Sequence, residues 1–408
     1  MAGPKIGVWL VGARGGVAST VSVGLAALQS GAAPTTAGLV TELPEFSGCG
    51  LASWDQLVLG GHEIRGGTLA ESVQKLEQQQ GAIPPGSADL HNERLLEIDR
   101  RIRPGVIYRS GPAIESMAQD AHTALTNPTP REAIGLIEED LRSFQAENGL
   151  DRVTVVLLLS AEPTVELGSV PATWDELEQT LDSPSDCPLS ASSLYAIAAL
   201  RGGMPVVNFT PALGADCPAI EELARAKGTP HTGSDGKTGE TLLKSVLAPM
   251  FRSRRLEVMS WVSHNLLGNQ DGRVLSDPEH RGSKLSNKQA LLEELLGADA
   301  QATRPQSLVS IESVESFGDW KTAWNHVHFR GFLGVPMTLQ FTWQGCDSVL
   351  AAPLVLDLVR LVNLAADRGV SGAVPDLGAF FKRPNSGGPA AFDEQMTRLT
   401  EWARGESS

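Results

Sequence analysis

The sequence predicts a doubly wound α/β domain, in which helices cover both faces of a parallel sheet, joined to a smaller α+β unit. Residues 5–28 (KIGVWLVGARGGVASTVSVGLAAL) have the pattern of a strand, a glycine-rich turn and an amphipathic helix. Residues 152–161 (RVTVVLLLSA) are rich in Val and Leu, which is typical of a strand buried on both faces of a parallel sheet. After about residue 255, closely spaced strands replace the alternation of strands and helices.

The remaining elements of the first unit follow from the same patterns. Strands are expected at 37–40, 55–61 and 204–209, and helices at 131–147 and 192–200. Strands and helices that alternate in this way build βαβ units, and therefore a parallel sheet.

The second unit is expected to be an α+β structure whose sheet is open on one face. Its strands are predicted at 256–262, 306–317, 326–334 and 335–343. Its one helix is predicted at 287–296. The chain then continues into a helix expected at 347–369, which begins at Asp347. This helix is more apolar than a surface helix, so we expect it to pack back against the first unit.

Composition limits the classes of partner. The chain has 408 residues and a formal net charge of −15, which repels nucleic acid and anionic membranes. No uncharged apolar stretch approaches the roughly 20 residues that span a bilayer, and the N-terminus lacks the pattern of a secretory signal. The four cysteines are scattered, which argues against a zinc site or a disulfide framework and favours the cytoplasm. A phosphorylated substrate would need a local concentration of lysines.

The glycine-rich turn is the first candidate binding site. Gly12, Gly15 and Gly16 lie between a strand and a helix, where backbone amides at a helix N-terminus hold a pyrophosphate. Arg14 stands where the second glycine of GxGxxG is usual, and a tight turn without a ligand is the alternative. Two acidic residues, Glu42 and Glu63, are candidates for binding the adenine ribose, and spacing alone does not choose between them.

Two polar stretches have the residue types of a ligand site. Residues 263–272 (SHNLLGNQDG) directly follow an apolar run, and are expected to form a turn or a polar wall around a ligand. Within 233–247, Lys237, Thr238 and Gly239 stand at a predicted helix start, which suits a phosphate or a metal-bridged anion.

Charged residues follow in two further stretches. Lys284 and Lys288 are four residues apart and share one face if helical, and Asp319 lies beside Lys321. Each stretch by itself also fits a solvated surface, and Asp347 also fits a helix N-cap.

Taken in order, these stretches resemble the motifs of the myo-inositol-1-phosphate synthase family, and the resemblance spans nearly the whole chain from Gly12 to Lys382. SHNLLGNQDG resembles SYNHLGNNDG, and SDGKTGETLLKSV resembles DDxKSGQTxxKSV. The other matching stretches are VVNFTPALGAD, SKLSNK, GDWK, DSVLAAPLVLDLV, GGHEIRGG and LLSAEPT.

The resemblance implies roles for individual residues. Family active-site positions fall on Asp235, Lys284, Lys288, Lys321, Asp347 and Lys382. Residues implied to contact the sugar phosphate are Asn265, Thr238, Gly239, Lys288 and Lys382. Residues implied to contact NAD are Gly12, Gly15, Gly16, Val17, Ala18, Glu63, Ser160, Ala161, Asn208, Thr210, Asp235 and Asp347. Thr238 and Asp319 match positions near a monovalent or divalent cation, and the resemblance favours Glu63 over Glu42 as the cofactor contact.

The resemblance also implies architecture and activity. Residues 1–241 and 347–408 would form a Rossmann-type NAD-binding domain, and 242–346 an inserted catalytic and tetramerisation domain of a homotetramer. The implied reaction is the NAD-dependent cyclisation of D-glucose 6-phosphate to 1D-myo-inositol 3-phosphate. The alternatives are an NAD-dependent cyclase or dehydrogenase acting on another phosphorylated sugar, and a non-catalytic NAD-binding regulator.

The chain departs from the family pattern at several positions. Arg14 interrupts the glycine loop, and Glu162 and Pro163 replace Asn and Thr. Phe209 replaces a glycine, and His264 replaces a tyrosine. We expect these residues to alter the nucleotide loop and the nicotinamide pocket. Glu240 further replaces a glutamine, and Gln270 an asparagine.

Overall fold

The structure is a computed structural model. It describes residues 3–78, 81–119, 122, 128–268, 292, 295–297, 305–385 and 387–406. Lys284, Lys288, Gln270 and most of the helix predicted at 287–296 lie outside the described residues.

A seven-stranded sheet forms the centre of the larger part of the molecule, and every described pairing in it is parallel. Its order is β11-β6-β5-β4-β1-β2-β3. The strands are β1 (Ile6–Val11), β2 (Leu57–Glu63), β3 (Ile102–Pro104), β4 (Arg152–Leu157), β5 (Val206–Asn208), β6 (Pro230–Thr232) and β11 (Gly372–Ala373). The order steps outward in both directions from β1, so this is the doubly wound arrangement that the sequence predicts.

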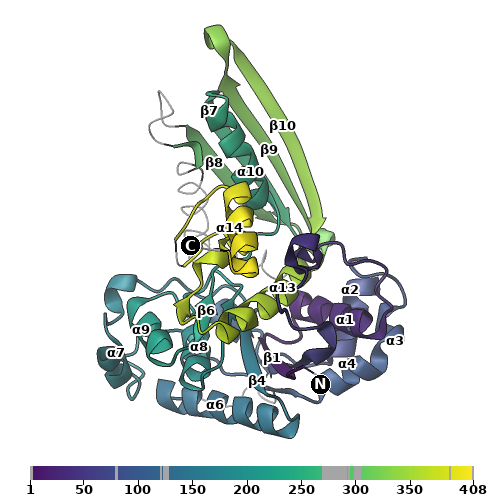
Figure 1. The fold of residues 1–408 in the computed structure, drawn as a ribbon, viewed down its shortest axis with the longest axis vertical. Coiled ribbons are helices and arrows are strands. Elements are labelled where there is room, and N and C mark those ends of the chain that lie inside the picture. Colours follow the sequence, from purple (N-terminus) through teal and green to yellow (C-terminus); the bar gives the residue numbers. More distant parts are fainter. Residues whose placement is uncertain are drawn as a thin grey trace.

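Helices cover both faces of this sheet (Figure 1). One face packs against α6 (Pro130–Glu147), α7 (Trp174–Thr180), α8 (Ala191–Arg201) and α9 (Pro218–Ala226). The other packs against α1 (Gly16–Ser30), α13 (Asp347–Asp367) and α14 (Phe392–Arg404). Shorter helices near β2 and β3 are α2 (Leu69–Gln78), α3 (Ser87–Leu90), α4 (Asn92–Asp99) and α5 (Pro112–Glu115). All six residues of β1 are buried, as expected for a central strand with both faces covered.

The strand predicted at 37–40 is wrong. Gly38 has φ +93°, and a 3₁₀ turn, η1 (Val40–Glu42), follows it. The backbone N–H groups of Val40 and Thr41 donate to the carboxylate of Asp357 on α13, at 2.6 and 3.1 Å. A carboxylate more than 300 residues away along the chain therefore takes the last amide of the predicted strand and the amide that follows it.

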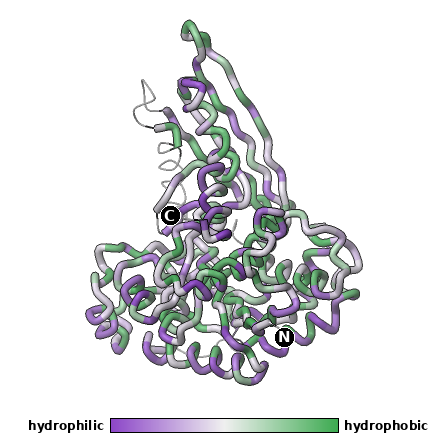
Figure 2. The backbone as a smooth tube through the Cα atoms, viewed as in Figure 1, coloured by the Kyte–Doolittle hydropathy of each residue, from purple (hydrophilic) through white to green (hydrophobic). Residues whose placement is uncertain are grey.

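A four-stranded sheet of order β10-β9-β7-β8 extends away from the larger part (Figure 1). Its strands are β7 (Glu257–Leu267), β8 (Gln306–Ser313), β9 (Trp320–Arg330) and β10 (Pro336–Cys346). One face packs against α10 (Glu240–Ser253) through Phe251 and Trp261, and the other exposes Leu308 and Trp324. The sheet open on one face is thus confirmed. The tip of the β9–β10 hairpin is apolar and exposed (Figure 2).

The long apolar helix predicted at 347–369 is α13, and it packs against α1 and the central sheet as expected. Among the described residues it is the one helix long and apolar enough to cross a membrane, and 72% of its most apolar window is buried inside the protein. Its hydrophobic surface is therefore used as core.

A buried ion pair fixes the start of α10. Glu240 and Lys244 lie one helical turn apart, their side chains are each 1% exposed, and Lys244 Nζ lies 2.6 Å from Glu240 Oε1. Lys244 also lies over the ring of Trp261. The glutamate that departs from the family pattern therefore neutralises a buried lysine of the same helix.

Lys244→Met should lower the free energy of unfolding by about 3–5 kcal/mol, because it removes the ammonium that neutralises the buried Glu240. The double variant Glu240→Leu/Lys244→Met should recover most of that loss. Urea unfolding followed by tryptophan fluorescence measures both. Arg94→Met, which breaks the exposed pair with Glu97, is the control and should cost less than about 1 kcal/mol. A double variant as unstable as Lys244→Met would contradict this account.

Candidate functional site

A cavity of about 820 Å³ opens at the carboxyl ends of β1, β2 and β4, where doubly wound sheets bind their ligands. The starts of α1 and α13 and part of α2 also line it. Eight of the residues predicted to contact NAD line this cavity: Gly12, Gly15, Gly16, Val17, Ala18, Glu63, Ser160 and Asp347.

The glycine loop lets backbone approach backbone closely. Gly12 has φ +90°, and a Cβ on it would lie 3.1 Å from the carbonyl oxygen of Leu158. A Cβ on Gly15 would lie 3.1 Å from the carbonyl oxygen of Gly12. Gly16 then begins α1, so its first amides face the cavity without side chains above them. This arrangement fits the pyrophosphate of NAD.

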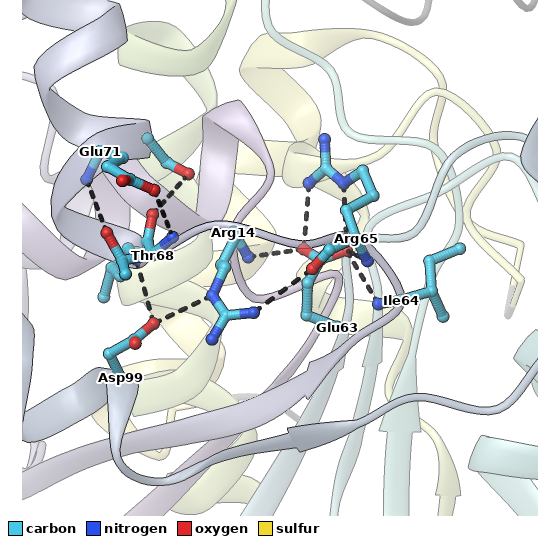
Figure 3. A network of polar contacts seen from close by, with 9 residues as sticks. Arg14, Glu63, Ile64, Arg65, Thr68, Glu71 and Asp99 are labelled. Carbon is cyan, nitrogen blue, oxygen red and sulfur yellow. Dashed lines mark hydrogen bonds and ion pairs between the residues drawn. The ribbon is translucent and has the colours of Figure 1, made fainter. Parts of the chain in front are cut away.

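Glu63 ends β2 and its side chain is 2% exposed. Its carboxylate accepts backbone N–H groups from Arg14, Ile64 and Arg65, at 2.8, 3.0 and 3.1 Å. It also accepts Nε and Nη2 of Arg65, both at 3.0 Å (Figure 3). The guanidinium of Arg65 and the backbone donors hold the pKa of Glu63 below its usual value despite burial.

Arg14 does not block the glycine loop. Its guanidinium turns away to Asp99, with Nε 2.9 Å from Oδ1, and Nη1 donates to the carbonyl of Arg65 at 3.3 Å (Figure 3). The same Asp99 oxygen accepts the backbone N–H of Leu69 at the start of α2. The departure at Arg14 thus ties the loop to neighbouring elements.

An ion pair forms between two predicted active-site residues that lie 147 positions apart. Lys382 Nζ donates to Asp235 Oδ1 at 2.7 Å, and the backbone N–H of Lys382 donates to the carbonyl of Asp235. Asp235 has φ +61°, a conformation that costs a non-glycine residue roughly 1–3 kcal/mol and that clusters at functional sites. The ring of Phe209 packs on the adjacent Gly236, where any Cβ would meet it at 2.1 Å. Phe209 therefore supports the loop that carries Asp235.

A second chain of contacts joins three more predicted residues. Thr238 Oγ1 donates to Asp347 Oδ1 at 3.4 Å, and the backbone N–H of Asp347 donates to the carbonyl of Asp319 at 3.0 Å. The carboxylate of Asp319 accepts the N–H and Oγ–H of Ser348, at 2.9 and 2.6 Å, and the thiol of Cys346. Burial raises the pKa of Asp319. The first turn of α13 is therefore held from the end of the loop that precedes β9.

Residues 263–267 are strand and not loop, which corrects the turn expected there. Because side chains alternate along β7, Asn265 and His264 lie on opposite faces of the sheet. Asn265 is 1% exposed, and its Oδ1 is buried without a hydrogen-bond partner in the described part of the chain. His264 is exposed and stacks on Trp324, so this departure lies away from the buried face that carries Asn265.

A family comparison matches residues 6–404 to an NAD-binding family described as myo-inositol-1-phosphate synthase. The chain belongs to the myo-inositol-1-phosphate synthase family. It is 30% identical over 395 residues to inositol-3-phosphate synthase 1 of Bacteroides thetaiotaomicron, covering 93% of the chain and 89% of that protein. It is 26% identical over 391 residues to inositol-3-phosphate synthase 1 of Oryza sativa subsp. japonica, covering 89% and 75%.

Solved structures have the same fold. The inositol-3-phosphate synthase of Caenorhabditis elegans superposes with a TM-score of 0.86 at 24% identity, covering 99% of this chain and 86% of that one. A myo-inositol-1-phosphate synthase-related protein of Thermotoga maritima superposes with a TM-score of 0.77 at 24% identity, covering 98% of both chains. The Rossmann-type fold of this family member is therefore established.

Four other predicted site residues, Ala161, Asn208, Thr210 and Lys321, do not line the cavity. Asn208 and Thr210 hydrogen-bond to each other, with Thr210 N and Oγ1 donating to Asn208 Oδ1 at 3.1 and 2.8 Å. Ala161 follows the lining residue Ser160, and Lys321 lies on β9 opposite Gly345 of β10. Lys237 turns away from the loop: its buried ammonium donates to Gln395 on α14, and burial lowers its pKa to about 8.

Sequence reasoning missed three groups at this family site. Arg65 binds Glu63, Ser348 binds Asp319, and Tyr195 lines the cavity while its hydroxyl contacts Nδ1 of the buried His62 at 2.9 Å. Arg65 had a signal, because a basic residue two positions after the acid that ends β2 falls at the ribose-binding point of this fold. The other two depend on contacts that no local pattern reports.

Glu162 lines the cavity and caps α8 from outside the helix. It accepts the hydroxyls of Ser190 and Ser192, at 2.5 and 2.6 Å, and the backbone N–H of Ser192 at 3.1 Å. Burial raises its pKa to about 7 in spite of these donors. The departure from the family's neutral residue therefore places a titrating acid beside the cofactor cavity.

The contribution of Glu162 to the free energy of unfolding should fall as pH rises from 4.5 to 7, because native Glu162 keeps its proton where the unfolded chain has lost it. At 1.36 kcal/mol per pKa unit the total is about 3 kcal/mol. Glu162→Gln should remove this part of the slope in urea unfolding measured across that range. Glu166→Gln, at an exposed position nearby, is the control. Parallel profiles for wild type and Glu162→Gln would contradict the assignment.

Proposed function

We propose that this protein converts D-glucose 6-phosphate to 1D-myo-inositol 3-phosphate with NAD as a catalytic, non-consumed cofactor. The observation that carries the proposal is the 2.7 Å pair between Lys382 and Asp235, which brings together two family active-site positions that lie 147 residues apart in the chain. Family membership and the glycine loop beside an 820 Å³ cavity give it independent support.

The cofactor fits the cavity through the chain's own groups. The amides at the start of α1 bind the pyrophosphate, and Glu63 receives hydroxyls of the adenine ribose. When bound, NAD supplies a reversible two-electron oxidation of the substrate at C5. The substrate's own phosphate takes the C6 proton, and side chains of the protein stabilise the two oxyanions.

Lysine side chains stabilise the negative charge that develops on the substrate. Oxidation at C5 acidifies C6, and the enolate attacks the C1 aldehyde, so negative charge appears on the C5 and C1 oxygens in turn. Lys321 and Lys284 hold the C5 oxygen and move its proton, while Lys382 and Lys288 hold the C1 oxygen or the phosphate. Asp235 orients the Lys382 ammonium, since one of its three N–H donors points at that carboxylate.

The proposed substrate-binding site also includes Asp347, Thr238 and Gly239. Asp347 lines the cavity and accepts the Thr238 hydroxyl, so both groups are oriented before the substrate binds. Gly239 brings the start of α10 close to the indole of Trp343, where any Cβ would lie 3.2 Å from Nε1. Asn265 offers its buried Oδ1 to a substrate hydroxyl.

A cation between Thr238 and Asp319 belongs to the same proposal. Asp319 Oδ1 lies 3.6 Å from the position of a Cβ on Gly16, at the helix start that binds the pyrophosphate. Two anionic groups this close require a cation or a proton between them. The described residues contain no group of three His, Cys, Asp or Glu that would hold a metal alone, so phosphate oxygens would complete its coordination.

We also propose a cytoplasmic homotetramer. The four described cysteines are free, as expected in a reducing compartment. The outer face of the four-stranded sheet exposes apolar side chains, which is typical of an interface. Light scattering of the purified protein tests the assembly. In this proposal residues 242–346 form the inserted catalytic and tetramerisation domain, and residues 1–241 with 347–408 form the NAD-binding domain.

Product analysis decides between a synthase and a dehydrogenase. Purified protein with NAD and D-glucose 6-phosphate should yield inositol phosphate by ³¹P NMR, with no stoichiometric rise in absorbance at the NADH wavelength. Accumulation of reduced cofactor would identify a dehydrogenase, and turnover of a different phosphorylated sugar would overturn the substrate.

Lys382→Met should lower kcat by at least about 10³-fold, because it removes positive charge where an oxyanion develops. Binding of NAD, followed by tryptophan fluorescence, should change little. Lys227→Met, an exposed lysine at the end of α9, is the matched control and should retain full activity. Lys321→Met tests the C5 role in the same way. Turnover retained by Lys382→Met or Lys321→Met would contradict the role given to that residue.

A further inference from the structure

The guanidinium of Arg65 lies in the space between the glycine loop and Glu63. Its Nε and Nη2 lie 3.0 Å from the two carboxylate oxygens of Glu63 (Figure 3). Nη2 also lies 3.7 Å from where a Cβ on Gly15 would stand. In this fold the pyrophosphate of the cofactor binds at the glycine loop, and the hydroxyls of the adenine ribose bind the acid that ends the second strand. The space between the loop and Glu63 is therefore where the adenine ribose would lie.

The carboxylate of Glu63 is saturated in this state. A carboxylate offers about four lone-pair positions, and Glu63 already accepts five N–H contacts. Three come from backbone amides, which are fixed by the loop and by the end of β2. The other two come from the Arg65 side chain. A ribose hydroxyl therefore finds an acceptor on Glu63 when the guanidinium moves aside.

The guanidinium of Arg65 can leave Glu63, but it stays close to the ribose site. Its side chain is 31% exposed and lines the cavity, whereas Glu63 beside it is 2% exposed. Its backbone N–H stays bound to Glu63, so a displaced guanidinium remains within one side-chain length of the ribose. A guanidinium in that position has the fork geometry that binds phosphate with two N–H groups.

The charged groups around Glu63 differ from those expected in a site that rejects a 2′-phosphorylated ribose. An acid at the end of the second strand ordinarily repels a 2′-phosphate. Here the charge of Glu63 is compensated by Arg65, and Lys75 on α2 lines the same cavity. The buried guanidinium of Arg14 lies on the other side of Glu63 (Figure 3).

We propose that Arg65 makes this cofactor site accept a 2′-phosphorylated adenine ribose, so that the protein binds NADP as well as NAD. On binding NAD, the ribose hydroxyls replace the guanidinium on Glu63. On binding NADP, the displaced guanidinium pairs with the 2′-phosphate. Arg65 is thus a specificity-determining residue, and its role rests on the proposed function only in that a dinucleotide occupies the cavity.

Binding of two probes without nicotinamide tests the proposal directly. Wild-type protein is titrated calorimetrically with ADP-ribose and with 2′-phospho-ADP-ribose at one fixed ionic strength. The two Kd values should agree within about tenfold, because the guanidinium offsets the repulsion by Glu63. Arg65→Gln should weaken the phosphorylated probe by about ten- to a hundredfold, the contribution of a charge-assisted hydrogen bond, and leave ADP-ribose within about threefold. Arg65→Lys should keep part of the affinity.

Two further variants keep the result interpretable. Arg131→Gln removes a guanidinium that pairs with Asp182 away from the cavity, and should change neither Kd. Glu63→Gln should weaken ADP-ribose more than the phosphorylated probe. Thermal melting confirms that each variant is folded.

Three outcomes would overturn the inference. A wild-type preference for ADP-ribose of more than about a thousandfold, or about 4 kcal/mol, would show that the site rejects the 2′-phosphate. Equal weakening of both probes by Arg65→Gln would assign Arg65 to the pyrophosphate instead. An unchanged affinity for the phosphorylated probe would leave Arg65 a structural partner of Glu63. If neither probe binds to wild type, the cofactor site of the proposed function fails as well.

Discussion

The carboxylate of Asp319 holds together the two sheets and the cofactor cavity. It lies just before β9 and accepts the N–H and hydroxyl of Ser348 in the first turn of α13. The same helix runs on through the core beneath the central sheet, where Asp357 fixes the segment after α1. Movement of Asp319 would therefore shift the start of α13, and with it Asp347 and the wall of the cavity.

Charge is distributed in pairs around the site, although the chain as a whole is strongly acidic. Lys382 faces Asp235, and Arg65 faces Glu63. An isolated buried charge costs several kcal/mol, so the pairing of Lys382 with Asp235 and of Arg65 with Glu63 stabilises all four groups. In the proposed reaction an anionic substrate would meet positive groups that are already oriented, which lowers the reorganisation needed when charge develops.

Several departures from the family pattern are compensated within the chain. Arg14 is anchored by Asp99, Glu162 by two serines at the start of α8, and Glu240 by Lys244. Phe209 fills space that Gly236 leaves open. Each of these four side chains has a partner in the structure, so the backbone around the site keeps the geometry of the fold.

The sequence by itself determined the doubly wound sheet, the glycine loop, the long core helix α13 and the family. These features depend on local periodicity, on turn residues and on motif order, all of which are visible along the chain. Three short strands, β3, β6 and β11, escaped prediction because two or three residues carry no periodic pattern. Only the tertiary structure decided that residues 37–40 form no strand, since Asp357 takes the amides of Val40 and of the following Thr41. It also decided that His264 faces away from Asn265, that Lys382 meets Asp235, and that Arg65 lies on Glu63. The Asp357 and Lys382 contacts join segments far apart in the chain, so no local stretch of sequence contains both partners. The other two depend on how far β7 extends and on the direction of the Arg65 side chain, which no local pattern reports.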